Sequence, residues 1–127
     1  MVFRTGAGKR GFTLIELLVV LAILALLLTL AVPRYFRSID HSKETVLREN
    51  LRITREMIDK FYGDQGRYPR TLDELVEKKY LRALPIDPVI DSDRGWVLIA
   101  PEGGDGVYDL RSGAAGHTRD GRPYGAL

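Results

Sequence analysis

The chain has 127 residues, a formal net charge of +2 at pH 7 and no cysteine. This length suits one membrane helix and one small domain, and the low net charge lacks the basic field that marks nucleic-acid-binding proteins. Disulfide bonds are excluded, so a small domain must rely on packing, on a neighbouring chain or on a metal ion for its stability.

The most apolar part of the chain is the segment from Phe12 to Val32, in which Glu16 is the one charged residue. As a helix this segment would be about 31 Å long, close to the roughly 30 Å thickness of the bilayer hydrocarbon. The segment can therefore cross a membrane once.

Three basic residues, Arg4, Lys9 and Arg10, precede this apolar segment. Without them the net charge of the chain is −1, so the rest of the protein is nearly neutral. Positive charge before a span keeps that end in the cytoplasm. The sequence therefore predicts a cytoplasmic N-terminus and an exported C-terminal domain.

Two simple interpretations of the apolar segment leave Glu16 unexplained. One is a single-pass anchor, and the other is a secretory signal that is cut near Thr29-Leu-Ala31. A carboxylate in hydrocarbon costs several kcal/mol unless it is paired, and acidic residues inside a membrane are functional candidates by default. The apolar run is also longer than an ordinary signal peptide requires.

A third interpretation rests on the junction Lys9-Arg10-Gly11-Phe12-Thr13-Leu14-Ile15-Glu16-Leu17. This sequence resembles the class III signal of type IV pilins and type II secretion pseudopilins. In those families a membrane-embedded aspartyl protease cuts after the glycine, and the same enzyme methylates the new N-terminal residue. The resemblance implies that residues 1–11 are a leader, that cleavage separates Gly11 from Phe12, and that Phe12 becomes N-methylated.

Glu16 lies four residues after Phe12 and therefore on the same face of a helix. A buried carboxylate and a buried ammonium each need a partner. The resemblance implies that Glu16 of an incoming subunit faces the Phe12 amine of its neighbour during assembly. The sequence alone leaves open a pairing of Glu16 within its own chain.

Pro33 follows the apolar segment, where it would kink the helix or melt one turn, unless the helix simply ends there. Helix-forming sequence continues to about Tyr62, which favours a continuous helix, and Gly63 and Gly66 are expected to end it. An apolar stripe with helical spacing predicts a buried face on this second half. Its members are Leu47, Leu51, Ile58 and Phe61.

The remaining sequence predicts a small head domain. Thr71 and Glu74 form a capping-box pattern that opens a short helix to about Tyr80. Two strands, 96–99 and 107–110, are expected to form an antiparallel hairpin, and residues 84–88 and 111–127 are expected to be ordered loops, with Tyr124 as an anchor for the second.

The predicted fold class is therefore α+β: a long N-terminal helix, membrane-spanning in its first half, packed on a small antiparallel β-sheet head, as in pilins. The predicted parts are the leader 1–11, a transmembrane and filament-core helix 12–33, its amphipathic continuation 34–62, and a periplasmic head 63–127.

The head extends the resemblance through Gln65-Gly-Arg-Tyr-Pro69, Leu72-Asp-Glu-Leu75, Pro85-Ile-Asp-Pro88, the single tryptophan and Tyr108-Asp-Leu-Arg-Ser-Gly113. These segments are similar to those of the major pseudopilin of type II secretion. Many type IV pilins close their C-terminal loop with a disulfide, so the lack of cysteine favours the pseudopilin branch.

The same resemblance raises the question of a structural calcium ion in the C-terminal loop. Calcium takes six to eight oxygen ligands, and the candidates here are Asp109, Ser112 and Asp120, with Asp105 nearby. The aspartate of the family's Gly-Ala-Asp-Gly segment is missing from Gly113-Ala-Ala-Gly116. No metal site is therefore assigned, and calcium remains a hypothesis.

Catalysis finds little support in the sequence. No thiol nucleophile exists, the two histidines, His41 and His117, are isolated, and no glycine-rich loop joins a strand to a helix. The sequence therefore predicts a structural protein rather than an enzyme.

The resemblance implies a subunit of a type II secretion pseudopilus, processed by prepilin peptidase in the bacterial inner membrane and polymerised into a periplasmic filament that drives export across the outer membrane. Its implied partners are copies of itself, minor pseudopilins, the inner-membrane assembly platform and the peptidase. Two alternatives are a type IV pilin of a surface fibre (for adhesion, motility or DNA uptake) and a membrane-anchored monomeric binding domain.

Overall fold

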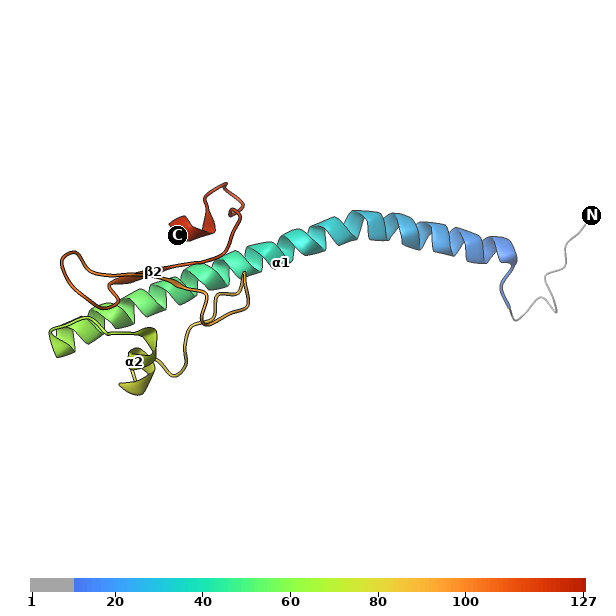
Figure 1. Cartoon of the computed structure of the whole chain (residues 1–127). Helices are drawn as coiled ribbons and strands as arrows, with labels where there is room; N and C mark the ends of the chain where they lie inside the picture. Colours follow the sequence, from blue (N-terminus) through green and yellow to red (C-terminus); the bar gives the residue numbers. More distant parts are fainter. Residues whose placement is uncertain (1–10) are drawn as a thin grey trace, which may run out of the picture. The chain divides into compact units, whose positions relative to one another are not determined.

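The computed structural model describes residues 11–127 and contains three helices and one two-stranded sheet in that range (Figure 1). The chain divides into two compact units that meet inside the first helix, Met1–Ile39 and Asp40–Leu127. The prediction of an α+β fold with a long N-terminal helix and a small antiparallel sheet is confirmed. The elements are α1 (Leu14–Gln65), α2 (Leu72–Glu77), β1 (Val97–Ile99), β2 (Asp109–Arg111) and the 3₁₀ helix η1 (Tyr124–Ala126).

The first part of α1 is apolar on every face. Its large side chains between Leu14 and Val32 are all exposed, from 44% for Val32 to 76% for Leu14. By length and composition this helix could cross a membrane. Pro33 lies inside α1, so the helix does not end at that residue.

The second part of α1, residues 40–65, carries the predicted apolar stripe. Leu47, Leu51, Ile58 and Phe61 are all at most 1% exposed, as their spacing predicted. Thr54 fills the gap in the stripe and is also 1% exposed, and its hydroxyl group donates to the Asn50 carbonyl oxygen at 2.7 Å. A buried hydroxyl is tolerated when it is hydrogen-bonded in this way.

The helix α1 ends at Gln65, later than the end near Tyr62 that Gly63 and Gly66 led us to expect. Gly63 lies within α1, which continues to Gln65. Gly66 then adopts a φ of +71°, a left-handed conformation that suits glycine and is common just after a helix. One helical glycine costs only about 1 kcal/mol, and the buried stripe next to it offsets that cost.

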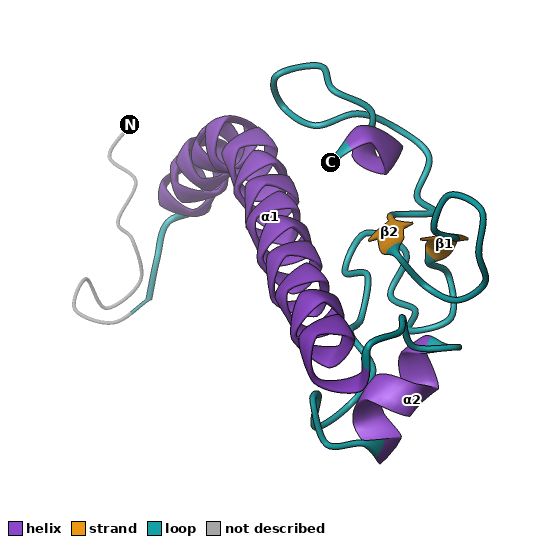
Figure 2. Ribbon diagram, turned by 90° about the vertical axis from the view of Figure 1, so that its left-hand side faces the viewer, coloured by secondary structure: helices purple, strands orange, loops and turns teal. Residues whose placement is uncertain are grey.

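The predicted hairpin is confirmed with shifted bounds. β1 and β2 are antiparallel, and the paired residues include Val97 with Arg111 and Ile99 with Asp109. The hairpin, α2 and η1 all lie on one side of the second part of α1 (Figure 2). They cover its apolar stripe, and Trp96, Val107 and Leu110 join the same buried cluster.

The short helix α2 begins where the sequence predicted but ends at Glu77 rather than near Tyr80. Thr71 is the N-cap, and its hydroxyl oxygen accepts from the Glu74 amide at 3.3 Å. The Glu74 carboxylate accepts from the Arg70 amide at 2.9 Å, where a reciprocal capping box would use the Thr71 amide. Lys79 has a φ of +65°, which stops the helix.

The proline-rich loop between Leu84 and Pro88 is ordered by contacts with distant parts of the head. Asn50 of α1 donates to the Ile86 carbonyl oxygen at 2.7 Å, and the Trp96 indole donates to the Pro85 carbonyl oxygen at 2.8 Å. Asp87 is fully buried. These contacts hold a segment without helix or strand against α1 and the rest of the head.

Candidate functional site

The predicted cleavage point lies immediately before α1. Gly11 and Phe12 are both exposed, and neither belongs to the helix. Gly11 has a φ of +107°, which L-residues with a side chain rarely adopt. Phe12 is 87% exposed. The Gly11–Phe12 peptide bond thus lies on a short non-helical stretch. The basic residues at positions 4, 9 and 10, which the sequence places before the cleavage point, lie outside the described residues.

Glu16 takes part in a reciprocal capping box at the start of α1. The Thr13 amide donates to Glu16 Oε2 at 3.1 Å, and the Glu16 amide donates to Thr13 Oγ1 at 3.0 Å. The Leu17 amide donates to the Thr13 carbonyl oxygen at 3.1 Å and starts the helical ladder. Two amide groups that a helix N-terminus would otherwise leave without partners are therefore satisfied by side chains.

The capping box gives the Glu16 carboxylate a partner within its own chain. The N-terminal end of a helix carries partial positive charge, which stabilises a nearby carboxylate. An ionised carboxylate has two oxygens and about four acceptor sites, so one bond to Thr13 leaves capacity for a further donor. The bond to Thr13 therefore still allows Glu16 to pair with a Phe12 amine, either of its own chain or of another subunit, which are the two possibilities that the sequence left open.

Thr13 is a helix-capping residue that the sequence patterns did not single out. The signal was present, because Thr13 and Glu16 form the same Thr-x-x-Glu pattern that predicted the cap of α2. The other hydroxyl of the apolar segment, on Thr29, donates to the Leu26 carbonyl oxygen at 2.6 Å, so it needs no external partner.

The sequence comparisons identify the family of this chain. Residues 6–32 match the prokaryotic N-terminal methylation motif. The chain is 35% identical over 120 residues to the type II secretion system core protein G of Pseudomonas aeruginosa, an alignment that covers 82% of each chain. This chain belongs to the type II secretion core protein G family of major pseudopilins.

Further relatives of this pseudopilin support the assignment. The core protein G of Klebsiella michiganensis is 30% identical over 123 residues, which cover 79% of this chain and 87% of that protein. The type IV major pilin PilA of Myxococcus xanthus is 32% identical over 74 residues, but these cover 58% of this chain and 34% of the pilin. No solved structure matches.

The three candidate calcium ligands of the pseudopilin bind other groups of the protein. Asp109 pairs with Arg55, with 2.7 Å between Oδ1 and Nε. The Ser112 hydroxyl donates to the buried carboxylate of Asp87. The remaining candidate, Asp120, accepts from the Thr118 hydroxyl group, which lowers the pKa of the Asp120 carboxyl.

Each of the three candidate side chains therefore has a partner within the protein. Within residues 11–127 no group of three or more His, Cys, Asp and Glu side chains could hold a metal ion. Calcium requires six to eight oxygen ligands, usually with several carboxylates. The candidate residues do not fit a calcium site in this conformation.

Proposed function

We propose that this pseudopilin is a prepilin of the inner membrane that matures by cleavage after Gly11 and methylation of the Phe12 amine. The mature subunit assembles into a periplasmic pseudopilus, and growth of this filament drives exported proteins through the outer membrane. Its partners are other copies of itself, minor pseudopilins, the assembly platform and the prepilin peptidase.

The observation that carries the proposal is the carboxylate of Glu16 at the N-terminus of an otherwise apolar helix. Cleavage before Phe12 would leave a positive amine four residues from Glu16, and methylation keeps that charge. Opposite charges in a low-dielectric environment attract strongly and must both be compensated. The amine of a neighbouring subunit supplies a second donor, from which the Glu16 carboxylate can accept a hydrogen bond.

The exposed apolar surface of α1 supports assembly as the next step. Side chains from Leu14 to Val32 face outward on every side of the helix. Lipid covers such a surface before assembly, and equivalent helices of other subunits can cover it in a filament core. A head-to-tail contact of this kind repeats without closing and so builds a filament.

The intact mass of the mature protein tests the processing steps. Chains purified from cells that contain the peptidase should begin at Phe12 and be heavier by one methyl group, and cells without the peptidase should yield the full precursor. A chain that retains residues 1–11 in the presence of the peptidase would overturn the proposal and would favour a membrane-anchored monomer.

A type IV pilin is the second candidate function, because the pilin of Myxococcus xanthus is also similar to this chain. The two candidates predict different phenotypes in a deletion strain. Lost secretion of exported proteins with normal surface fibres supports the pseudopilin, whereas lost fibres with normal secretion supports the pilin. Secretion assays and electron microscopy of the same cultures measure both outcomes.

A further inference from the structure

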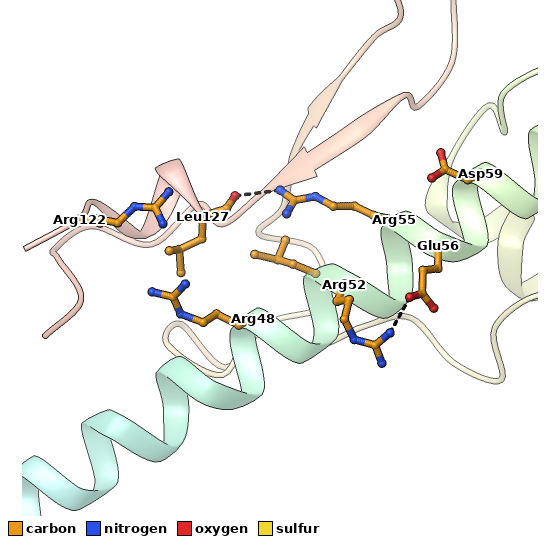
Figure 3. Close-up of a pocket in the computed structure, with 8 residues that line it drawn as sticks. Arg48, Arg52, Arg55, Glu56, Asp59, Arg122 and Leu127 are labelled. Carbon is orange, nitrogen blue, oxygen red and sulfur yellow. Dashed lines mark hydrogen bonds and ion pairs between the residues drawn. The ribbon is translucent and has the colours of Figure 1, made fainter. Parts of the chain in front are cut away.

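The C-terminal part of the head is gathered around one cationic side chain, that of Arg55 on α1. Its Nε donates to Asp109 Oδ1 at 2.7 Å. One terminal nitrogen donates to the Leu110 carbonyl oxygen at 3.0 Å and to the Leu127 carbonyl oxygen at 2.8 Å. Figure 3 shows the Arg55 side chain extending from α1 to Leu127, in a pocket that Arg48, Arg52 and Arg122 also line.

The three acceptors come from different parts of the C-terminal segment. Asp109 and Leu110 belong to β2, and Leu127 follows η1. One carboxylate oxygen and two backbone carbonyl oxygens are the kinds of ligand that a hard divalent cation takes from a loop. Here the guanidinium group occupies that position, with planar donors that can reach several oxygens at once.

The Arg55 contacts compete directly with a metal ion. Asp109 is a candidate calcium ligand, and a cation bound to its Oδ1 would lie against the guanidinium group and be repelled by it. Ser112 and Asp120, the other candidates, are held by Asp87 and Thr118. The polar groups that calcium would organise are thus already organised by the chain itself.

We propose that Arg55 supplies from within the chain the positive charge that orders the segment from Asp109 to Leu127, so that this segment keeps its fold without a bound divalent cation. The guanidinium group is covalently part of the chain and cannot dissociate as a metal ion can. Stability of the head is therefore independent of calcium. This inference stands apart from the proposed function, because it concerns the folding of the chain itself.

Replacement of the Arg55 side chain is the direct test, and it is made on the full chain in detergent micelles. Arg55→Met keeps much of the aliphatic side chain but removes all three hydrogen bonds. It should lower the melting temperature by roughly 5 °C or more, since charge-assisted hydrogen bonds are among the stronger polar contacts. Amide hydrogen exchange should accelerate mainly in residues 109–127.

Arg52→Met is the matched control. Arg52 lies on the same helix and pairs with Glu49 at 2.7 Å, but its side chain is 55% exposed and its partners lie within one turn of it. Surface pairs of this type contribute little to stability. The control should leave both the melting temperature and the exchange of residues 109–127 nearly unchanged.

Calcium itself supplies the second arm of the test. The wild-type melting temperature should be the same in calcium chloride and in EDTA. If calcium stabilises the wild-type chain by several degrees over EDTA, or if Arg55→Met and Arg52→Met melt alike, the proposal is overturned.

Arg55→Lys keeps the test decisive if the methionine variant does not fold. Lysine retains the charge but lacks the fork that reaches Asp109, Leu110 and Leu127 together. Faster exchange confined to residues 109–127 supports the proposal, and wild-type exchange in that segment overturns it.

Discussion

At the scale of single residues, Glu16 has a structural role that can be separated from assembly. Its carboxylate accepts from the Thr13 amide and the Thr13 hydroxyl accepts from the Glu16 amide, so the two side chains together cap the first turn of α1. Exchange of a capping hydroxyl group for an apolar group typically costs about 1 kcal/mol of helix stability. The first turn of α1 should therefore depend on Thr13 as well as on Glu16.

Thr13→Val should loosen that first turn. Valine keeps the branched shape of threonine but provides no oxygen for the Glu16 amide, so exchange of the amides of residues 14–17 should become several-fold faster, as a loss of about 1 kcal/mol implies. Amide exchange measured by NMR in micelles checks this. Thr29→Val is the control, because its hydroxyl bonds a carbonyl oxygen and caps nothing; equal exchange in both variants would contradict the capping role.

Glu74 provides a second prediction at this scale, through the pH dependence of stability. Arg67 donates two hydrogen bonds to its carboxylate, at 2.8 and 3.0 Å, and the Arg70 amide donates a third. These contacts lower the pKa of Glu74 to about 2. A carboxyl group whose pKa is lowered in the folded state stabilises the protein above its unfolded pKa, and that contribution is lost as the pH falls.

The head should therefore lose stability from Glu74 as the pH falls from about 4.5 through about 2. Glu74→Gln should lower stability at pH 6 and flatten the decline between about pH 5 and about pH 2, as measured by urea unfolding. Glu77→Gln, on the exposed side of the same helix, is the control. If Glu74→Gln and the wild type decline in parallel, the contacts of Glu74 do not set this dependence.

At the scale of elements, the second part of α1 is held by one buried stripe. The head covers that stripe, and Leu51 at its centre is 1% exposed while its neighbour Ile53 is 37% exposed. Burial of apolar surface is the main stabilising contribution, and a cavity in a packed core adds to the cost of truncation. Leu51 and Ile53, which have similar volumes, should therefore differ strongly in their contribution to the free energy of unfolding.

Leu51→Ala should destabilise the head by about 2–5 kcal/mol, because it removes buried methyl groups and leaves a cavity. Ile53→Ala, two residues away and partly exposed, should cost far less. Thermal melting of both variants in the same micelles checks the difference. Similar melting temperatures would show that the stripe does not form the core of the folded chain.

At the scale of the whole molecule, the membrane segment and the head have different tasks. The exposed apolar part of α1 fits lipid or other copies of itself, while the head folds on its own core. Glu16 favours the move of the apolar part of α1 from lipid to other copies of the chain, because its charge is costly in lipid unless it is paired. The proposed pairing with a neighbour's Phe12 amine therefore acts on assembly rather than on folding of the head.

Glu16→Leu should abolish filament assembly and leave membrane insertion, cleavage after Gly11 and the melting temperature of the head unchanged. Electron microscopy for filaments, mass spectrometry for processing and melting in micelles give the three readouts. Glu56→Leu, an exposed acidic residue outside the apolar segment, should assemble normally. Normal filaments from Glu16→Leu would rule out the proposed pairing.

The local features of this protein could be predicted from the sequence. The span, the motif around Gly11 and Glu16, the stripe from Leu47 to Phe61 and the hairpin all follow from composition, short motifs or helical and strand periodicity. The helix end at Gln65 was predicted less well. Burial against the head, which no local pattern contains, outweighed the helix-breaking preference of Gly63.

Only the tertiary structure decided how the C-terminal segment is held. Arg55 is 54 to 72 residues from the groups that it binds, and Ser112 is 25 residues from Asp87. The family resemblance suggested Asp109, Ser112 and Asp120 as possible ligands of one ion, but folding gives each a different protein partner. The sequence by itself determined where the long helix, the N-terminal methylation motif and the apolar segment lie, because these depend on neighbouring residues. The partners of the polar side chains depend on which distant segments the packed core brings together, and this only the folded chain decides.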